Sequence, residues 1–464
     1  MKKTSLISAL LLAFLAISMF SMLTVSHGSS GVSLSRDIVP LREELVDSAV
    51  LEAGLIESQG WWIDIVDAEL VANDGKGIYV AVLDTGLLSN YLSYFPPDRV
   101  DIKEEWGKGF SYNVAWNPLI NDYDWTWNPN RGFITNKFGS GHGTHMTSVL
   151  AGFATATRWY RGVAPKVTII PVLVLDTWFL PCPDPNYPGY HNGYVLFRGG
   201  SFEMIAAGIN YIADLAEEYN IKIIINLSLG GPLPNPIEEM AIDYAISKGV
   251  IVVAAAGNSG EFGMGWPAAY PQAISVAAGG WTDAWYHIAF TPAGIRADVP
   301  EKLNTMDRLG NNWQIFLEDF SSRPNPNYYY AGFSTRQTWI DLDVCTPGQA
   351  IVGPYKPYIY WSGTAWINPS IGYYYVWGTS PAAPHVSGIA AMVAQCYPEF
   401  EQFDMEWVLK KAAVRIPLAS DGAGCYDLYP TWYDFYWNDH DYGSGWLQAD
   451  EALFVASTHL KQLF

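Results

Sequence analysis

Basic residues are scarce in this sequence. Its 464 residues include 26 lysines and arginines against 46 aspartates and glutamates, which gives a formal net charge of −20. No basic cluster offsets this balance at any point of the chain. A surface of this sign repels the phosphates of nucleic acids and of anionic membranes. Neither is therefore expected as a partner.

Cysteine is also rare, with four residues in the whole chain. The spacing of Cys182, Cys345, Cys396 and Cys425 fits no zinc site. In an exported protein such cysteines pair as disulfides, and four of them allow three pairings among which the sequence does not choose. We favour Cys396 with Cys425, because this bond closes a short local loop.

Long apolar runs are missing beyond the N-terminus. The chain opens with two lysines and an uncharged apolar run from about Leu6 to Val25, which is the pattern of a secretory signal. The sequence predicts a signal peptide over residues 1–28, with cleavage near Ser26 to Ser30. The alternative is an uncleaved N-terminal anchor, because the run is nearly long enough to span a bilayer. Both interpretations place the protein outside the cell or on its surface, and only the anchor involves a membrane.

Apolar, β-branched runs alternate with helix-like stretches in the rest of the chain. These runs are typical of strands buried on both faces of a parallel sheet. They cover residues 77–84, 167–176, 221–231, 250–258 and 273–280. Helical periodicity covers 202–219 and 237–249. The alternation predicts an α/β fold with a doubly wound, mostly parallel sheet flanked by helices, in which functional residues gather at the carboxyl ends of strands.

Long segments rich in aromatic residues, Asn and Pro interrupt this alternation. They cover residues 101–138, 177–200, 281–332 and 418–440. We interpret them as surface loops or small excursions on one catalytic domain, residues 59–464, and the segment 281–332 is long enough to hold strands of its own. A short N-terminal segment, residues 29–58, separates the signal from that domain.

Three polar residues stand where strands end or a helix begins. Asp84 ends the first strong strand in VAVLDTG (80–86), and His142 lies among glycines in GSGHGTHMTSVLAG (139–152). Asn258 follows a run of small residues in AAAGN (254–258). Each has a structural alternative, since Asp and Asn are common turn residues. The glycines around His142 allow a ligand to approach closely, which favours a functional role there.

Ser380, in GTSPAAPHVSG (378–388), has two interpretations. Serine is a favoured helix N-cap and proline is favoured at the first helical position, so Ser380 followed by Pro381 reads locally as a helix start. The alternative is a nucleophile, and only the other motifs of the chain can favour it.

Taken together, these stretches resemble the subtilisin-like serine protease family. The order Asp84, His142, Asn258, Ser380 is the family's order, and NLSLGG (226–231) resembles its substrate-lining strand. Linking segments agree as well, among them GVAPKVTIIPVLVLD (162–176), DVCTPGQAI (343–351) and YGSGWLQADEAL (442–453).

The resemblance implies a serine endopeptidase acting on polypeptides. Ser380 would attack the peptide carbonyl, His142 would take its proton, and Asp84 would orient the imidazole. Asn258 and the backbone N–H of Ser380 would donate to the oxyanion. The residues that would line the primary specificity pocket are Ser228, Leu229, Gly230, Gly231, Ala255, Ala256 and Gly257.

Several further expectations follow from the resemblance. The small pocket residues predict a broad preference for large uncharged side chains, and a monomer is expected. The chemistry needs no cofactor. Structural calcium is compatible with acidic loops such as NDYDW (121–125) and NDHDYG (438–443), although no EF-hand pattern locates it.

The sequence also departs from the family, which usually has Met where Pro381 stands. Its segment 29–58 is too short for an independently stable propeptide domain, so we interpret it as a reduced one or as unrelated to maturation. An inactive scaffold that binds through its aromatic loops is the alternative function. A lipase or esterase is excluded by the chain order of the triad, and the relatives that use Glu as base are disfavoured by His142.

Overall fold

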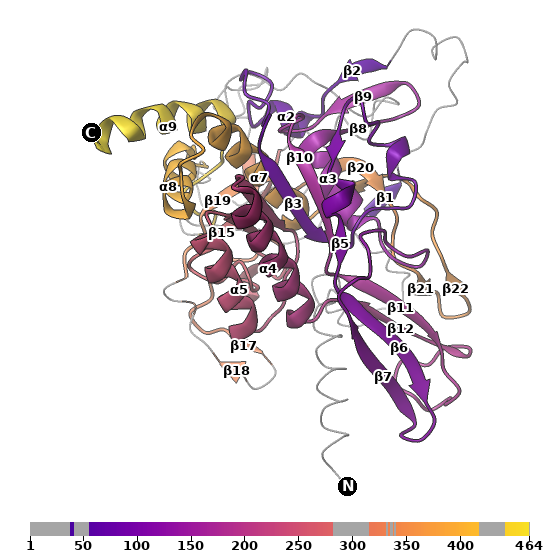
Figure 1. The fold of residues 1–464 in the computed structure, drawn as a ribbon. Coiled ribbons are helices and arrows are strands. Elements are labelled where there is room, and N and C mark those ends of the chain that lie inside the picture. Colours follow the sequence, from indigo (N-terminus) through magenta and orange to yellow (C-terminus); the bar gives the residue numbers. More distant parts are fainter. Residues whose placement is uncertain are drawn as a thin grey trace, which may run out of the picture.

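The computed structural model describes residues 38–40, 55–281, 315–330, 333–334, 337, 340–416 and 441–463. Figure 1 shows their arrangement. The predicted signal or anchor and the predicted insertion 418–440 lie outside these residues, so both stay predictions. In the described part of the chain, no helix is long and apolar enough to cross a membrane.

A nine-stranded sheet forms the centre of the molecule. Its main path runs β16-β15-β14-β13-β3-β10-β4, while β19 pairs with β15 and β5 pairs with β10. The strands are β3 (Tyr79–Asp84), β4 (Asp101–Ile102), β5 (Lys108–Gly109), β10 (Thr168–Leu173), β13 (Ile223–Leu227), β14 (Ile251–Ala255), β15 (Ile274–Trp281), β16 (Ile315–Leu317) and β19 (Val344–Pro347). All pairs are parallel except β15 with β16. The five strands expected from apolar runs are β3, β10, β13, β14 and β15, which confirms the predicted α/β class.

Helices cover both faces of the sheet, as expected for strands without a polar side (Figure 1). On one face lie α3 (His142–Ala151) and α7 (Thr379–Cys396); on the other lie α4 (Phe202–Tyr219) and α5 (Pro236–Ser247). Ser201 caps α4 by accepting from Met204 N. The other helices of the described residues are α2 (Trp61–Asp64), α8 (Gln402–Ala412) and α9 (Ala449–Leu463), with single turns η3 (Tyr91–Ser93), η4 (Glu104–Trp106) and η5 (Gly260–Phe262).

Two of the aromatic insertions form a projecting arm of β-hairpins (Figure 1). Segment 101–138 contains the hairpin of β6 (Ser111–Asn117) and β7 (Asp122–Asn128), and segment 177–200 lies mostly within that of β11 (Asp176–Pro181) and β12 (Tyr194–Gly199). The arm packs around a second core, which includes Met204 of α4 and consists of Tyr123, Trp178, Cys182, Tyr187, Val195, Phe197 and Met204. Aromatic residues of these two insertions therefore pack in this core as well as lying on the surface.

Smaller sheets border the main one. β1 (Ile38–Pro40), β23 (Gly372–Val376) and β20 (Ile351–Tyr355) form one, and β2 (Ile56–Ser58), β9 (Arg158–Arg161) and β8 (Gly152–Ala154) another. The pairs β17 (Tyr329–Tyr330) with β18 (Phe333–Ser334) and β21 (Tyr360–Trp361) with β22 (Trp366–Ile367) are short ribbons. The described strands β1 and β2 of segment 29–58 thus pair with the catalytic domain. Segment 281–332 does contain strands, namely β16 and β17.

The three described cysteines, Cys182, Cys345 and Cys396, form no disulfide. Cys182 lies in the core of the arm and Cys345 in the main core, whereas Cys396 is exposed. Each of the three complete pairings requires a bond between two of these residues, so none of the complete pairings is present. The favoured bond between Cys396 and Cys425 is not formed in this structure either, because Cys396 is a free, exposed cysteine.

Candidate active site

Asp84 and His142 meet at the carboxyl edge of the sheet. Asp84 is the last residue of β3, and its carboxylate is fully buried. Nδ1 of His142 lies 2.9 Å from Oδ1 and 2.8 Å from Oδ2 of Asp84. Oδ1 also accepts from the backbone N–H of Thr85. With Nδ1 committed to the carboxylate, Nε2 is the ring nitrogen left to handle a proton.

The start of α3 explains why His142 stands there. Gly141 is the N-cap of α3, and a Cβ on Gly143 would lie 2.5 Å from the carbonyl oxygen of Gly86. Only glycine at 143 lets the first turn approach the end of β3 so closely. Gly143 N also donates to Oγ1 of Thr85 at 2.9 Å. These contacts fix His142 against Asp84 while the His142 side chain keeps 10% exposure.

Ser380 lies in the first turn of α7, beside the end of β13. Helix α7 begins at Thr379 with Gly378 as N-cap, so the interpretation of Ser380 as the cap is wrong. Gly378 has a φ of 148°, a backbone conformation that favours glycine. It occupies the N-cap position two residues before Ser380. Pro381 is accommodated inside the first turn, where its missing N–H costs no helical hydrogen bond.

Two reciprocal hydrogen bonds join Ser380 to Ser228. Oγ of Ser228 donates to the carbonyl oxygen of Ser380 at 2.7 Å, and Oγ of Ser380 donates to that of Ser228 at 3.2 Å. Both residues are described, and no hydrogen bond joins Ser380 to His142 in this structure. The Ser380 hydroxyl is therefore committed to Ser228 in this structure.

Asn258 is oriented by Thr379, a residue that the sequence analysis did not single out. Oδ1 of Asn258 accepts from the backbone N–H of Thr379 at 2.9 Å and from Oγ1 of Thr379 at 3.0 Å. Gly257 N donates to the same hydroxyl at 3.0 Å. Anchoring Oδ1 in this way leaves Nδ2 as the group that can donate to a ligand next to α7.

The residues predicted to line a pocket lie on two facing segments. Gly231 and Trp266 exchange backbone hydrogen bonds of 2.8 and 2.9 Å, and Gly265 N donates to the carbonyl oxygen of Ala256 at 2.9 Å. The segment at Gly265 therefore connects two walls. One follows β13 and holds Ser228 to Gly231, and the other begins at the last residue of β14 and holds Ala255 to Gly257. A Cβ on Gly265 would lie 3.3 Å from Gly231 O and 3.8 Å from Ala256 O, between the walls. Sequence reasoning missed Gly265, since a glycine between loops carries no signal of its own.

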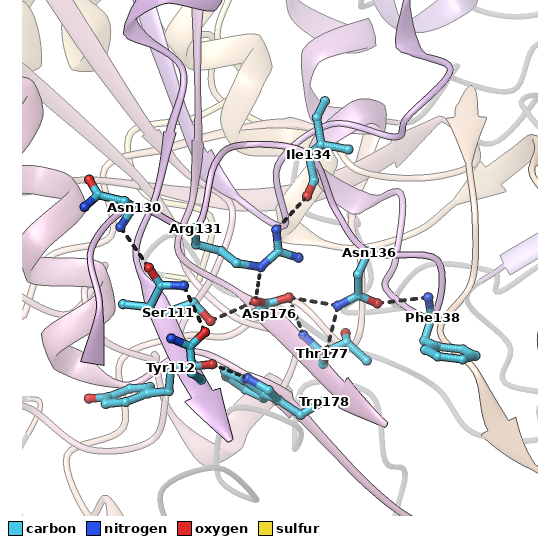
Figure 2. A network of polar contacts seen from close by, with 12 residues as sticks. Ser111, Tyr112, Asn130, Arg131, Ile134, Asn136, Phe138, Asp176, Thr177 and Trp178 are labelled. Carbon is cyan, nitrogen blue, oxygen red and sulfur yellow. Dashed lines mark hydrogen bonds and ion pairs between the residues drawn. The ribbon is translucent and has the colours of Figure 1, made fainter. Parts of the chain in front are cut away.

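A buried aspartate connects the arm to the loop that carries His142 (Figure 2). Asp176 is only 4% exposed and begins β11, just beyond the end of β10. Its carboxylate accepts from Oγ of Ser111 at 2.7 Å, Nε of Arg131 at 2.9 Å, Nδ2 of Asn136 at 3.1 Å and the N–H of Thr177 at 2.8 Å.

The partners of Asp176 come from three segments. Ser111 begins the first hairpin of the arm, Thr177 belongs to the second, and Arg131 and Asn136 lie in the loop before α3. Asn136 further accepts from Phe138 N and donates to Thr177 O. The insertions are thus attached to the loop that ends at His142.

The acidic loop proposed for calcium is used for hydrogen bonding within the arm. Asp122 accepts from Tyr123 N and from the hydroxyl of Tyr187, and Asp124 accepts from Asn117. Among the described residues, no group of three or more His, Cys, Asp or Glu side chains could hold a metal ion. The second acidic loop, 438–443, lies partly outside the described residues, so its binding of calcium stays untested.

Comparisons with known proteins identify the family of the chain. The model of the subtilase family matches residues 75–443. The chain belongs to the subtilase family of serine endopeptidases. Its members need no cofactor for catalysis.

Individual relatives are distant. A subtilisin of Bacillus sp. (strain TA39) is 28% identical over 349 residues, 75% of this chain and 63% of that protein. A thermitase of Thermoactinomyces vulgaris is 28% identical over 321 residues, 69% of this chain and 76% of that protein. The solved structure of sphericase is similar with a TM-score of 0.51 and 26% identity over 84% of this chain and 97% of its own. The match to the subtilisin thus spans under two thirds of that relative.

Proposed function

We propose that this subtilase is an exported or surface-anchored endopeptidase that forms an acyl-enzyme on Ser380. The observation that carries the proposal is the contact of Nδ1 of His142 with both carboxylate oxygens of Asp84 at the carboxyl end of β3. Oγ of Ser380 attacks the scissile carbonyl as its proton passes to Nε2 of His142. The imidazolium then protonates the leaving amine, and Asp84 stabilises its charge throughout.

The oxyanion is held by Nδ2 of Asn258 and by the backbone N–H of Ser380. The anchoring of Asn258 by Thr379 supports this role, because it fixes the amide before substrate arrives. The N-terminus of α7 adds a favourable dipole.

Polypeptide substrates are proposed to place large uncharged side chains between the two walls joined at Gly265. Glycine and alanine at 230, 231, 256 and 257 leave room, and these wall residues carry no charge to hold a basic side chain. Export rests on the N-terminal pattern of lysines and apolar residues. N-terminal sequencing of the secreted protein tests it: a start near residues 27–31 supports signal cleavage, and an intact Met1 supports the anchor.

The activity is tested with casein and a fluorophosphonate probe on the full chain. We expect proteolysis and labelling in the wild type, neither in Ser380→Ala, and both in Ser362→Ala, an exposed control.

An inactive scaffold is the second candidate, supported by the aromatic arm. It predicts folded protein that neither cleaves casein nor reacts with the probe over a wide range of pH and temperature. The complete set of Asp84, His142, Asn258 and Ser380 favours the enzyme.

A further inference from the structure

A lysine at the end of β20 lies against the loop that presents His142. Lys356 is 6% exposed, and its Nζ donates to the carbonyl oxygen of Gly139 at 2.9 Å and to that of Pro357 at 3.3 Å. Its own carbonyl oxygen accepts from Gly141 N at 2.8 Å. Lys356 therefore holds the last turn before His142 both through its side chain and through its backbone.

The neighbouring Tyr355 also contacts this turn, through the side chain of Ser140. Oγ of Ser140 donates to the hydroxyl of Tyr355 at 3.3 Å and accepts from the backbone N–H of His142 at 3.1 Å. A Cβ on Gly141 would lie 2.7 Å from the backbone nitrogen of Lys356. The two segments are thus in direct contact along residues 139–141, with no room for a side chain at 141.

Lys356 is an unfavourable residue for stability alone. Among the described residues no carboxylate lies within ion-pair distance of its Nζ, and burial lowers the pKa of Lys356 to about 8. A buried ammonium with only carbonyl partners costs free energy that an apolar side chain of the same length would avoid. Residues that cost stability in this way occur mainly where a protein needs a particular arrangement of groups for its function.

We propose that Lys356 is a positioning residue for His142, acting through Gly139 and Gly141. This inference rests on the proposed function of His142 as the catalytic base. Asp176 fixes the loop at Asn136, and Lys356 fixes it at Gly139, three residues before the imidazole. Without the second anchor the turn 139–141 moves, and the imidazole of His142 shifts relative to Asp84 and to Ser380.

The decisive experiment compares Lys356→Met with wild type, using active enzyme counted by fluorophosphonate titration. Methionine preserves the length and burial of the side chain and removes the donor. We expect kcat per titrated site to fall roughly tenfold or more, because small misplacements of reacting groups cost that much. KM for a short peptide substrate should change less than twofold, and the thermal midpoint should not decrease.

Two further variants complete the design. Lys356→Gln retains a neutral donor and should recover part of kcat. Lys137→Met removes an exposed lysine of the same loop, whose ammonium lies over the ring of Phe138, and should leave kcat unchanged.

Several outcomes overturn the proposal. An unchanged kcat per site in Lys356→Met does so, as does a fall in kcat fully explained by fewer titratable sites and a lower thermal midpoint. Equal losses in the Met and Gln variants would also contradict it, since the donor would then be irrelevant. If the wild type itself is neither labelled nor active, the proposed function fails instead, which keeps the two failures distinct.

Discussion

Thr379 holds Asn258 through two donors on one residue. The backbone N–H and the hydroxyl of Thr379 both donate to Oδ1 of Asn258, at 2.9 and 3.0 Å. The residue next to Ser380 thus orients the side chain proposed to stabilise the oxyanion. Thr379 and Ser380 are the first two residues of α7, so the start of this one helix fixes their relative position.

Removal of the Thr379 hydroxyl should weaken the oxyanion site. Losing an oxyanion donor costs about 2.7–4 kcal/mol in the transition state, and we expect that loss for Asn258→Ala. Thr379→Val keeps the backbone contact and should lose about tenfold in kcat, whereas Thr379→Ser should resemble wild type. Steady-state kinetics of the double variant provide the check: if the two losses simply add, Thr379 does not act through Asn258.

Gly265→Val should change the size of side chain that the enzyme accepts. The new side chain would project between the walls at Gly231 and Ala256 and shorten the space between them. We expect kcat/KM for a peptide with Phe before the scissile bond to fall roughly 10- to 100-fold relative to one with Ala. Comparison of the two substrates on one preparation measures this, and a parallel loss on both would argue that the pocket lies elsewhere.

Asp176→Asn should loosen the attachment of the arm to the loop before His142. The amide cannot accept from all four donors, and Arg131 would lose its charged partner (Figure 2). We expect the free energy of unfolding to fall by about 2–3 kcal/mol, below the full cost of breaking a buried pair because Arg131 is partly exposed. Denaturant unfolding measures the effect. Asp184→Asn, in the arm but farther from this loop, is the matched control, and an equal loss there would contradict a special role for Asp176.

Glu238 should make the protein less stable as the pH rises. It is 1% exposed in the first turn of α5, and burial raises its pKa from 4.5 to about 8. The folded chain keeps this proton up to about pH 8 while the unfolded chain releases it near 4.5. The free energy of unfolding therefore falls between these values by up to ~1.4 kcal/mol per pH unit.

Glu238→Gln should remove that slope. Thermal unfolding between pH 5 and pH 8 measures it, with Glu239→Gln, a more exposed neighbour, as control. If the wild type and Glu238→Gln lose stability in parallel over this range, Glu238 does not titrate as we describe.

The central sheet and the motif residues could be predicted from the sequence, because their signals are local. An apolar β-branched run such as 221–231 specifies a buried strand by composition alone, and the parallel topology brings Asp84, Asn258 and the Ser228 segment to one edge. The order of the motifs then indicated their roles before any distance was known.

Other features depended on contacts between segments far apart in the chain. The start of α7 at Thr379 rather than after Ser380 depends on the backbone of Gly378, and the hold of Lys356 on Gly139 joins residues more than two hundred positions apart. The aromatic insertions were predicted as loops or small excursions, because neither the hydrophobic period nor the composition of a segment shows which hairpins pack into one core. The sequence by itself determined the strands and the chemical groups at their ends. Only the tertiary structure decided how the inserted segments hold those groups, because packing between distant segments leaves no periodic signal in the chain.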